Sequence, residues 1–250
     1  MRSLRKLAAA FRVRHEEVFS RGVKLQVVEN KKVLMLKIDG ATNSIIRKDS
    51  VYTGGYWDYF LPLACIRARP RILLIGAGLG TTPYQVRALL GKKADMEIVD
   101  NDANVVKLAR KYALGKAGYV IHVQDGCSFV AHAKKRYDLI ILDAYWKGAR
   151  IPKEFLTEAF MSDAANATKS DGILAINYAM GPAAMLGFGR FRRTLERFRN
   201  VYSVNTDSYG SMRIIICSKT LDKKTLLARI SERFVGKPSL MKSYRDMREI

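Results

Sequence analysis

A glycine-rich turn after a short apolar run constrains the fold of this chain more than any other feature. Residues 71–80 read RILLIGAGLG, so the apolar stretch stops at Gly76, Gly78 and Gly80. Glycine accepts positive φ angles and lets the backbone approach a ligand closely, and α/β folds use such turns to bind nucleosides. The segment therefore predicts a buried strand, a ligand-binding turn and a helix that starts near residue 81.

An acidic residue ends the next strand-like run. Asp100 follows the last glycine by twenty residues, the place where a carboxylate accepts hydrogen bonds from ribose hydroxyls. Thr81 occupies the position of the third glycine in a GxGxxG pattern, which argues against NAD and FAD. We therefore predict a nucleoside site of the S-adenosylmethionine type, formed by the three glycines and Asp100.

The pattern of segments after the turn predicts the fold class. Strand-like and helix-like segments alternate, which indicates right-handed βαβ units and a parallel sheet covered on both faces. We expect strands at 71–75, 95–99, 119–123, 137–142 and 172–178, with helices at 81–91, 102–112, 126–135, 153–168 and 183–198. Two further strand-like runs, 201–205 and 213–217, predict a terminal antiparallel hairpin. The fold class is α/β, an S-adenosylmethionine-type Rossmann fold.

Three parts are expected along the chain. Residues 1–50 predict a helix over 3–19 and a small antiparallel β-region, with strands at 23–29, 33–38 and 43–47. Residues 51–235 predict the Rossmann-like catalytic domain, which includes helices at 54–68 and 221–234. Residues 236–250 read as a basic C-terminal tail.

The net charge of +21, from 44 basic and 23 acidic residues, is the unusual property of the composition. Such an excess is found in proteins that bind nucleic acid, but no zinc-finger, KH or RNP-type motif accompanies it, and a solvated basic surface explains it equally well. No apolar run reaches the ~18 residues of a membrane span. The three cysteines are far apart, which favours a reducing, cytoplasmic setting and neither a disulfide framework nor a metal site.

Two further acids follow predicted strands. Asp143 ends YDLIILD, the most apolar strand-like run, and a carboxylate at such a strand end lies beside the ligand crevice of an open α/β sheet. We predict that Asp143 is catalytic. Asp125, followed by Gly126, either contacts the nucleoside base or caps the next helix, as Asp102 is expected to do in its own helix.

Aromatic residues cluster before the sheet, in VYTGGYWDY, and again after Asp143. Aromatic faces beside a carboxylate can hold a cationic substrate, or they can simply fill a domain junction. The candidate substrate-binding residues are Tyr52, Tyr56, Asp58 and Tyr145.

From about residue 20 to 220 the chain resembles the spermidine synthase family of aminopropyltransferases. The resemblance rests on IDG at 38–40, Tyr56-Trp57-Asp58, LLIGAGLG, VDND, QDG and LDAYW, in family order and spacing. It implies transfer of an aminopropyl group from decarboxylated S-adenosylmethionine to a small-molecule amine, without a metal, in a homodimer or tetramer. In this family a tyrosine, here Tyr52 or Tyr56, hydrogen-bonds the attacking nitrogen.

The sequence also departs from the family pattern. The acid of the family's GGGDGG motif falls on Leu79, and the second acid of its DxxDP motif falls on Trp146. The nucleoside half of the site is kept, whereas much of the polyamine half is apolar or aromatic. Methyl transfer from S-adenosylmethionine to a small molecule or RNA is therefore the alternative function, and a non-enzymatic nucleoside-binding subunit is a third.

Overall fold

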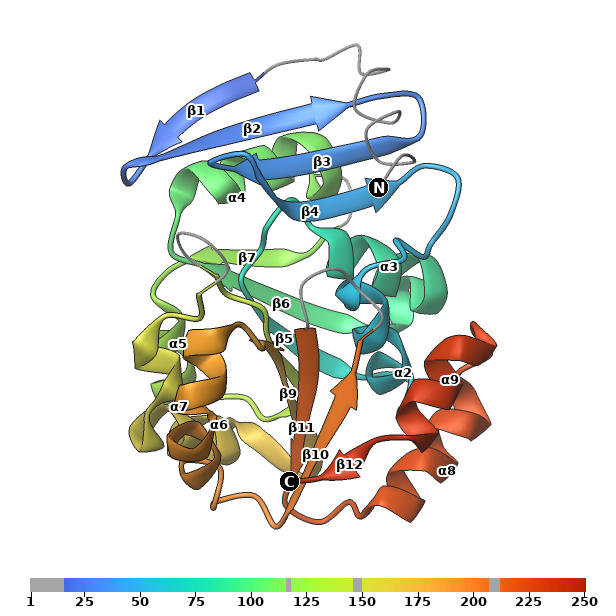
Figure 1. The fold of residues 1–250 in the computed structure, drawn as a ribbon. Helices are drawn as coiled ribbons and strands as arrows, with labels where there is room; N and C mark the ends of the chain where they lie inside the picture. The colour runs from blue at the N-terminus through green and yellow to red at the C-terminus, as the bar shows by residue number, and fades with distance from the viewer. Residues whose placement is uncertain (1–15, 116–117, 146–149, 207–211) are drawn as a thin grey trace.

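The computed structural model describes residues 16–115, 118–145, 150–206 and 212–250 as two β-sheets with helices around the larger one (Figure 1). Most of the helix expected over residues 3–19 lies outside these residues. The prediction is wrong for residues 16–19, which belong to strand β1 (Glu16–Ser20). β1 turns back at Arg21-Gly22, both with positive φ, and pairs with the next strand, so tertiary pairing overrides the local helical pattern.

The smaller sheet is antiparallel, with strands in the order β1-β2-β3-β4. β2 (Val23–Glu29), β3 (Val33–Ile38) and β4 (Ala41–Arg47) lie close to their expected positions. Between β2 and β3, the Asn30 side-chain oxygen accepts hydrogen bonds from the amides of Lys32 and Val33, both at 2.8 Å. This turn fixes the register that buries one face of the sheet against the rest of the chain.

The larger sheet has eight strands in the order β12-β10-β11-β9-β8-β5-β6-β7. The five strands from β9 to β7 are parallel, and β11, β10 and β12 add antiparallel strands at one edge. The bounds are β5 (Arg71–Ile75), β6 (Asp95–Asp100), β7 (Val120–Val123), β8 (Tyr137–Leu142), β9 (Thr168–Ala179), β10 (Asn200–Asn205), β11 (Met212–Ser218) and β12 (Arg248–Glu249). The Rossmann order and the terminal hairpin are confirmed.

Helices cover both faces of this sheet. Their bounds are α2 (Leu61–Ala64), α3 (Thr81–Leu90), α4 (Ala103–Ala109), α5 (Gly126–Ala131), α6 (Glu158–Ala167), α7 (Pro182–Arg193), α8 (Lys223–Arg233) and α9 (Pro238–Arg245). Alternate residues of β5 point to opposite faces: Ile72 and Leu74 pack in the core under α2, α3, α4, α8 and α9, and Leu73 and Ile75 in the core under α5, α6 and α7. Both faces of the central strands are therefore buried, as their apolar sequences predict.

Two expected segments differ in the structure. The helix predicted over 54–68 is a 3₁₀ helix at Tyr56–Phe60 followed by the single turn of α2, because Gly54 has a positive φ and the chain bends there. The residues after 235 are more than a basic tail. They form α9 and β12, and the Tyr244 hydroxyl, fully buried, donates a hydrogen bond to the backbone oxygen of Tyr59.

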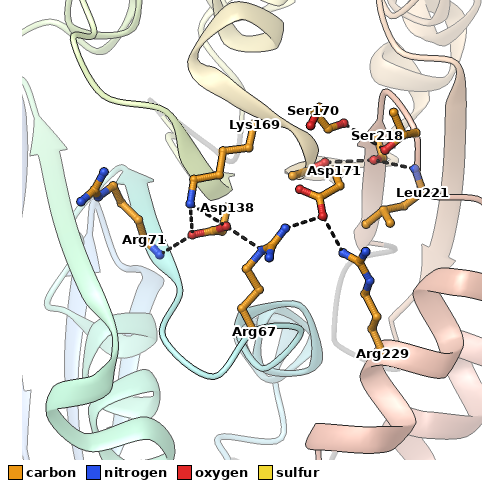
Figure 2. A network of polar contacts seen from close by, with 11 residues as sticks. Arg67, Arg71, Asp138, Lys169, Ser170, Asp171, Ser218, Leu221 and Arg229 are labelled. Carbon is orange, nitrogen blue, oxygen red and sulfur yellow. Dashed lines mark hydrogen bonds and ion pairs between the residues drawn. The ribbon is translucent and has the colours of Figure 1, made fainter.

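A network of ion pairs ties the amino ends of the parallel strands together (Figure 2). Asp138, 1% exposed at the start of β8, accepts hydrogen bonds from the Arg71 amide at 2.8 Å and from Lys169 Nζ at 2.9 Å. Arg67 bridges Asp138 to Asp171 of β9. Asp138 therefore has a structural role, and it lies at the opposite end of β8 from Asp143.

Candidate functional site

A large cavity opens at the carboxyl edge of the parallel strands. It has a volume of about 790 Å³ and is lined by the residues that follow β5, β6, β7 and β8, together with the turn between β1 and β2. β5 lies between β6 and β8, so the strand order changes direction there, and open α/β sheets bind ligands at such a point. The volume is within the range of small-molecule sites.

The glycine turn lies against the cavity with a backbone conformation that favours glycine. Gly76 has a φ of 97°, and a Cβ atom there would stand 2.4 Å from the backbone oxygen of Asp143. Gly78, with a φ of 49°, also lines the cavity. Gly80 is the N-cap residue of α3 and packs against the Leu114 side chain. Its positive φ therefore shapes the turn, and Gly80 is not part of the cavity wall.

Asp100 lies at the carboxyl end of β6 and lines the same cavity. Its two carboxylate oxygens accept hydrogen bonds from the amides of Ala77, at 2.8 Å, and Asp102, at 2.9 Å. Burial raises the Asp100 pKa above its usual value, against the lowering effect of these two amides. Each oxygen retains an acceptor site, which is what a ribose diol requires.

Asp125 and Gly126 line the cavity at the start of α5. The Asp125 carboxylate accepts a hydrogen bond from the Ser128 amide at 2.8 Å, so it caps the helix. Gly126 is buried, and a Cβ atom there would stand 2.8 Å from the Ile75 side chain. Asp102 caps α4 as predicted, through hydrogen bonds from the amides of the first turn.

Asp143 also lines the cavity. Its Oδ1 accepts a hydrogen bond from Asn177 Nδ2 at 2.9 Å, and its Oδ2 accepts one of 3.4 Å from the Tyr56 hydroxyl. Burial raises the Asp143 pKa to about 7, although hydrogen bonds from Asn177, Tyr56 and Trp57 favour the charged form. A carboxyl group that titrates near neutrality is suited to accept a proton from an amine.

Of the four candidate substrate-binding residues, the structure brings two to Asp143. Tyr56 lines the cavity beside it, and Tyr145 lines the cavity while donating a 2.6 Å hydrogen bond to the Asn177 backbone oxygen. Burial, followed by the charge of Asp143, raises the pKa of both phenols.

Tyr52 and Asp58 do not line the cavity. Asp58 is 2% exposed and accepts hydrogen bonds from Thr53, the Gly54 amide and Gln85, so it holds the turn before the 3₁₀ helix. The Tyr52 ring lies under Lys237 Nζ at 4.5 Å, on the segment that leads into α9. The structure thus favours Tyr56 for the tyrosine that contacts the reacting groups.

Asn177 is the site residue that sequence reasoning missed. It is fully buried near the end of β9, the strand beside β8, and its amide orients the Asp143 carboxylate. A polar side chain inside the apolar run ILAINYA was the available signal, because a buried amide needs hydrogen-bond partners.

The two departures from the family pattern have different outcomes. Leu79 is fully buried in the core below the glycine turn, so that turn presents no carboxylate to the cavity at this position. Trp146 lies outside the described residues. Within the described ranges no group of three or more His, Cys, Asp or Glu side chains is placed to hold a metal ion, and no helix is long and apolar enough to span a membrane.

The chain is similar to two kinds of curated protein. The chain is 37% identical over 112 residues to an N-terminal histidine N-methyltransferase of Emericella nidulans, which covers 43% of this chain and 19% of that protein. It is 29% identical over 154 residues to a polyamine aminopropyltransferase of Clostridium botulinum, covering 58% of this chain and 52% of that protein. The chain thus spans between a fifth and about half of the length of these relatives.

Solved structures share the fold. A probable spermidine synthase from Corynebacterium glutamicum superposes with a TM-score of 0.70 at 18% identity, covering 89% of this chain and 88% of that chain. A spermidine synthase in complex with the transition state analogue AdoDATO gives 0.63 at 20% identity, covering 93% and 88%. The spermine/spermidine synthase domain matches residues 60–219, more than half of the sequence. The chain therefore belongs to the spermine/spermidine synthase domain family.

Proposed function

We propose that this protein transfers an aminopropyl group from decarboxylated S-adenosylmethionine to an amine. The observation that carries the proposal is the position of Asp143, a buried carboxyl group with a pKa raised to about 7, in the same cavity as the glycine turn and Asp100. One cavity thus combines a nucleoside-binding end with a proton acceptor. The relatives named as polyamine aminopropyltransferases support the same reaction.

The residues present fit a nucleoside donor. Asp100 retains acceptor sites for the ribose hydroxyls, and Gly76 and Gly78 leave the cavity wall free of side chains next to it. Asp125 and Gly126 would face the base, with Asp125 keeping its helix cap. The sulfonium carbon would then lie toward Asp143.

In the proposed step, the nitrogen lone pair of the amine attacks the donor carbon bonded to sulfur. The carbon–sulfur bond breaks, its electron pair stays on sulfur, and 5′-methylthioadenosine leaves. The Asp143 carboxylate accepts the proton lost by the nitrogen. Asn177 and Tyr56 hold that carboxylate in place, and alignment of the two reactants supplies most of the acceleration.

Methyl transfer from S-adenosylmethionine is a second candidate, favoured by two observations. Leu79 is buried, so the glycine turn does not offer the family's carboxylate to the amino group of a decarboxylated donor. Arg21 and Arg150 line the cavity, and a cation suits the carboxylate that S-adenosylmethionine retains. The related N-terminal histidine N-methyltransferase is consistent with this reaction.

The test is a product assay with each donor and a panel of amines that includes diamines, monoamines and histidine-terminated peptides. Formation of 5′-methylthioadenosine together with an amine heavier by one aminopropyl group supports the first proposal. S-Adenosylhomocysteine with a methylated amine supports the second. If the wild-type protein forms no more product than Asp143→Asn with either donor, both proposals are wrong.

We also propose a homo-oligomer, in a reducing cytoplasmic setting. Phe19, 76% exposed on edge strand β1, offers an apolar contact for a second copy, and the three cysteines are free thiols, two of them buried.

Nucleic-acid binding stays a prediction from the charge, to be tested by titrating RNA at several salt concentrations. One segment of the sequence carries several exposed arginines, namely Arg190, Arg192, Arg193, Arg197 and Arg199.

A further inference from the structure

A second, much smaller cavity lies behind the glycine turn. Its volume is about 20 Å³, and its wall includes Gly76, Gly78, Trp57, Thr82 and Asp143. Asp143 therefore borders both this small cavity and the large one that would hold the reactants, as do Gly76 and Gly78. The volume exceeds the roughly 10–15 Å³ that one water molecule needs, and it is too small for a substrate group.

One residue that lines this small cavity carries an unsatisfied polar group. Thr82 is 2% exposed, and its hydroxyl oxygen is buried without a hydrogen-bond partner in the described part of the chain. Thr82 also stands in the first turn of α3, a ten-residue helix whose N-cap residue, Gly80, has no side chain to accept hydrogen bonds from the first amides. An unpaired buried hydroxyl costs about 1–3 kcal/mol, so a partner is expected.

Asp143 has spare capacity for that partner. Asn177, Tyr56 and Trp57 each donate one hydrogen bond to the carboxylate, whose two oxygens have about four acceptor sites, so one site is left for a water molecule. The Tyr56 bond is long, at 3.4 Å. A water molecule can donate to Asp143 and exchange a hydrogen bond with the Thr82 hydroxyl, which gives it the two or more polar partners that a buried water requires.

We propose that this cavity is a site for one ordered water molecule that bridges the Thr82 hydroxyl and the Asp143 carboxylate, and that Thr82 is a positioning residue for Asp143. The water site stands on the geometry alone. Its effect on transfer rests on the proposed function, in which Asp143 accepts the proton of the amine.

The bridge has a consequence for the titration of Asp143. A donor to the carboxylate favours its charged form, so removing the bridge raises the Asp143 pKa further above its usual value. Among the described residues, the titratable groups that interact with Asp143 are Tyr56 and Tyr145, and both phenols have pKa values raised by burial and by Asp143 itself. Neither phenol changes charge near pH 7, so a change in the titration near pH 7 reports on Asp143.

The experiment compares the wild-type protein with Thr82→Val, which keeps the shape and removes the hydroxyl, and with Thr82→Ser, which keeps the hydroxyl. Crystals that diffract well enough to show waters should have one density peak between Thr82 and Asp143 in the wild-type protein and in Thr82→Ser. A dry cavity in the wild-type crystal overturns the proposal.

Carbon-13 NMR titration of the Asp143 carboxyl gives the second readout. We expect Thr82→Val to raise the Asp143 pKa by roughly 0.5 or more, and Thr82→Ser to leave it near the wild-type value. Equal pKa values in Thr82→Val and wild type overturn the positioning role, provided both melt at similar temperatures. Neither readout depends on catalytic activity. If the bridging water is present but the protein transfers no group, the proposed function is wrong and the water site still stands.

Discussion

Asn177 donates a 2.9 Å hydrogen bond from its amide nitrogen to Oδ1 of Asp143. The bond joins the ends of β9 and β8, two neighbouring parallel strands, and the Asn177 side chain that donates it is fully buried. A strand-borne donor holds the carboxylate more rigidly than a loop residue does, and it offsets part of the cost of burying a charge.

The first prediction concerns Asn177. Replacing it with leucine removes a donor to the charged form of Asp143, so the Asp143 pKa should rise above about 7. The base is active when deprotonated, and the rising limb of the pH–rate profile should therefore move to higher pH. The control is Asn205→Leu, an exposed position on β10, which should leave the limb in place. An unmoved limb in Asn177→Leu contradicts the role of this bond.

The second prediction is that Asp143→Asn stabilises the fold while it abolishes transfer. The folded-state pKa of Asp143 is raised, so the folded protein binds more protons than the unfolded chain between about pH 4 and pH 7, and its stability falls as pH rises through that window. The neutral amide avoids this cost, which is on the order of a few kcal/mol above pH 7. Thermal melts from pH 4 to 8 should show wild type and variant diverging only as pH rises. If the melting temperatures of wild type and variant differ by the same amount at every pH, burial does not raise the Asp143 pKa in the folded protein.

The third prediction separates two tyrosines. Tyr56→Phe removes the hydroxyl that donates to Asp143 Oδ2, and the transfer rate should fall by about tenfold, the effect of losing roughly 1.4 kcal/mol. Tyr52→Phe alters a ring that does not line the cavity and should keep a rate near that of wild type. Rates measured under donor saturation decide the point. A larger loss in Tyr52→Phe than in Tyr56→Phe reverses the assignment.

The fourth prediction concerns the ion-pair network of Figure 2. Asp138→Asn leaves Arg67 and Lys169 without their buried carboxylate, so the free energy of unfolding should drop by about 2–4 kcal/mol. Asp95→Asn is the control, because Asp95 pairs with Arg71 at the surface, where such pairs contribute about 0–1 kcal/mol. Urea unfolding measures both, and similar losses in the two variants contradict the structural role of Asp138.

Local patterns in the sequence were sufficient to predict the Rossmann domain. The strands RILLI and YDLIIL are apolar at nearly every position, as strands that are buried on both faces are. The glycines and the acids at strand ends are tied to the same edge of the sheet by topology alone, which is why Asp100 and Asp143 could be assigned to one cavity from spacing.

The errors lie where distant contacts decide the structure. Residues 16–19 form a strand because β2 pairs with them, and α9 is ordered because Leu240 and Tyr244 are buried in the core, which no local pattern indicates. Asp58 looks like a substrate ligand in the sequence, yet its carboxylate is used by the turn beside it. Asn177 meets Asp143 only through the order of strands in the sheet.

The measurement that tests the central claim most directly is a calorimetric titration of the purified protein with decarboxylated S-adenosylmethionine, 5′-methylthioadenosine, S-adenosylmethionine and S-adenosylhomocysteine. Aminopropyl transfer predicts tighter binding of the first two. A clear preference for the last two contradicts it and favours methyl transfer, and binding of none contradicts the nucleoside site itself.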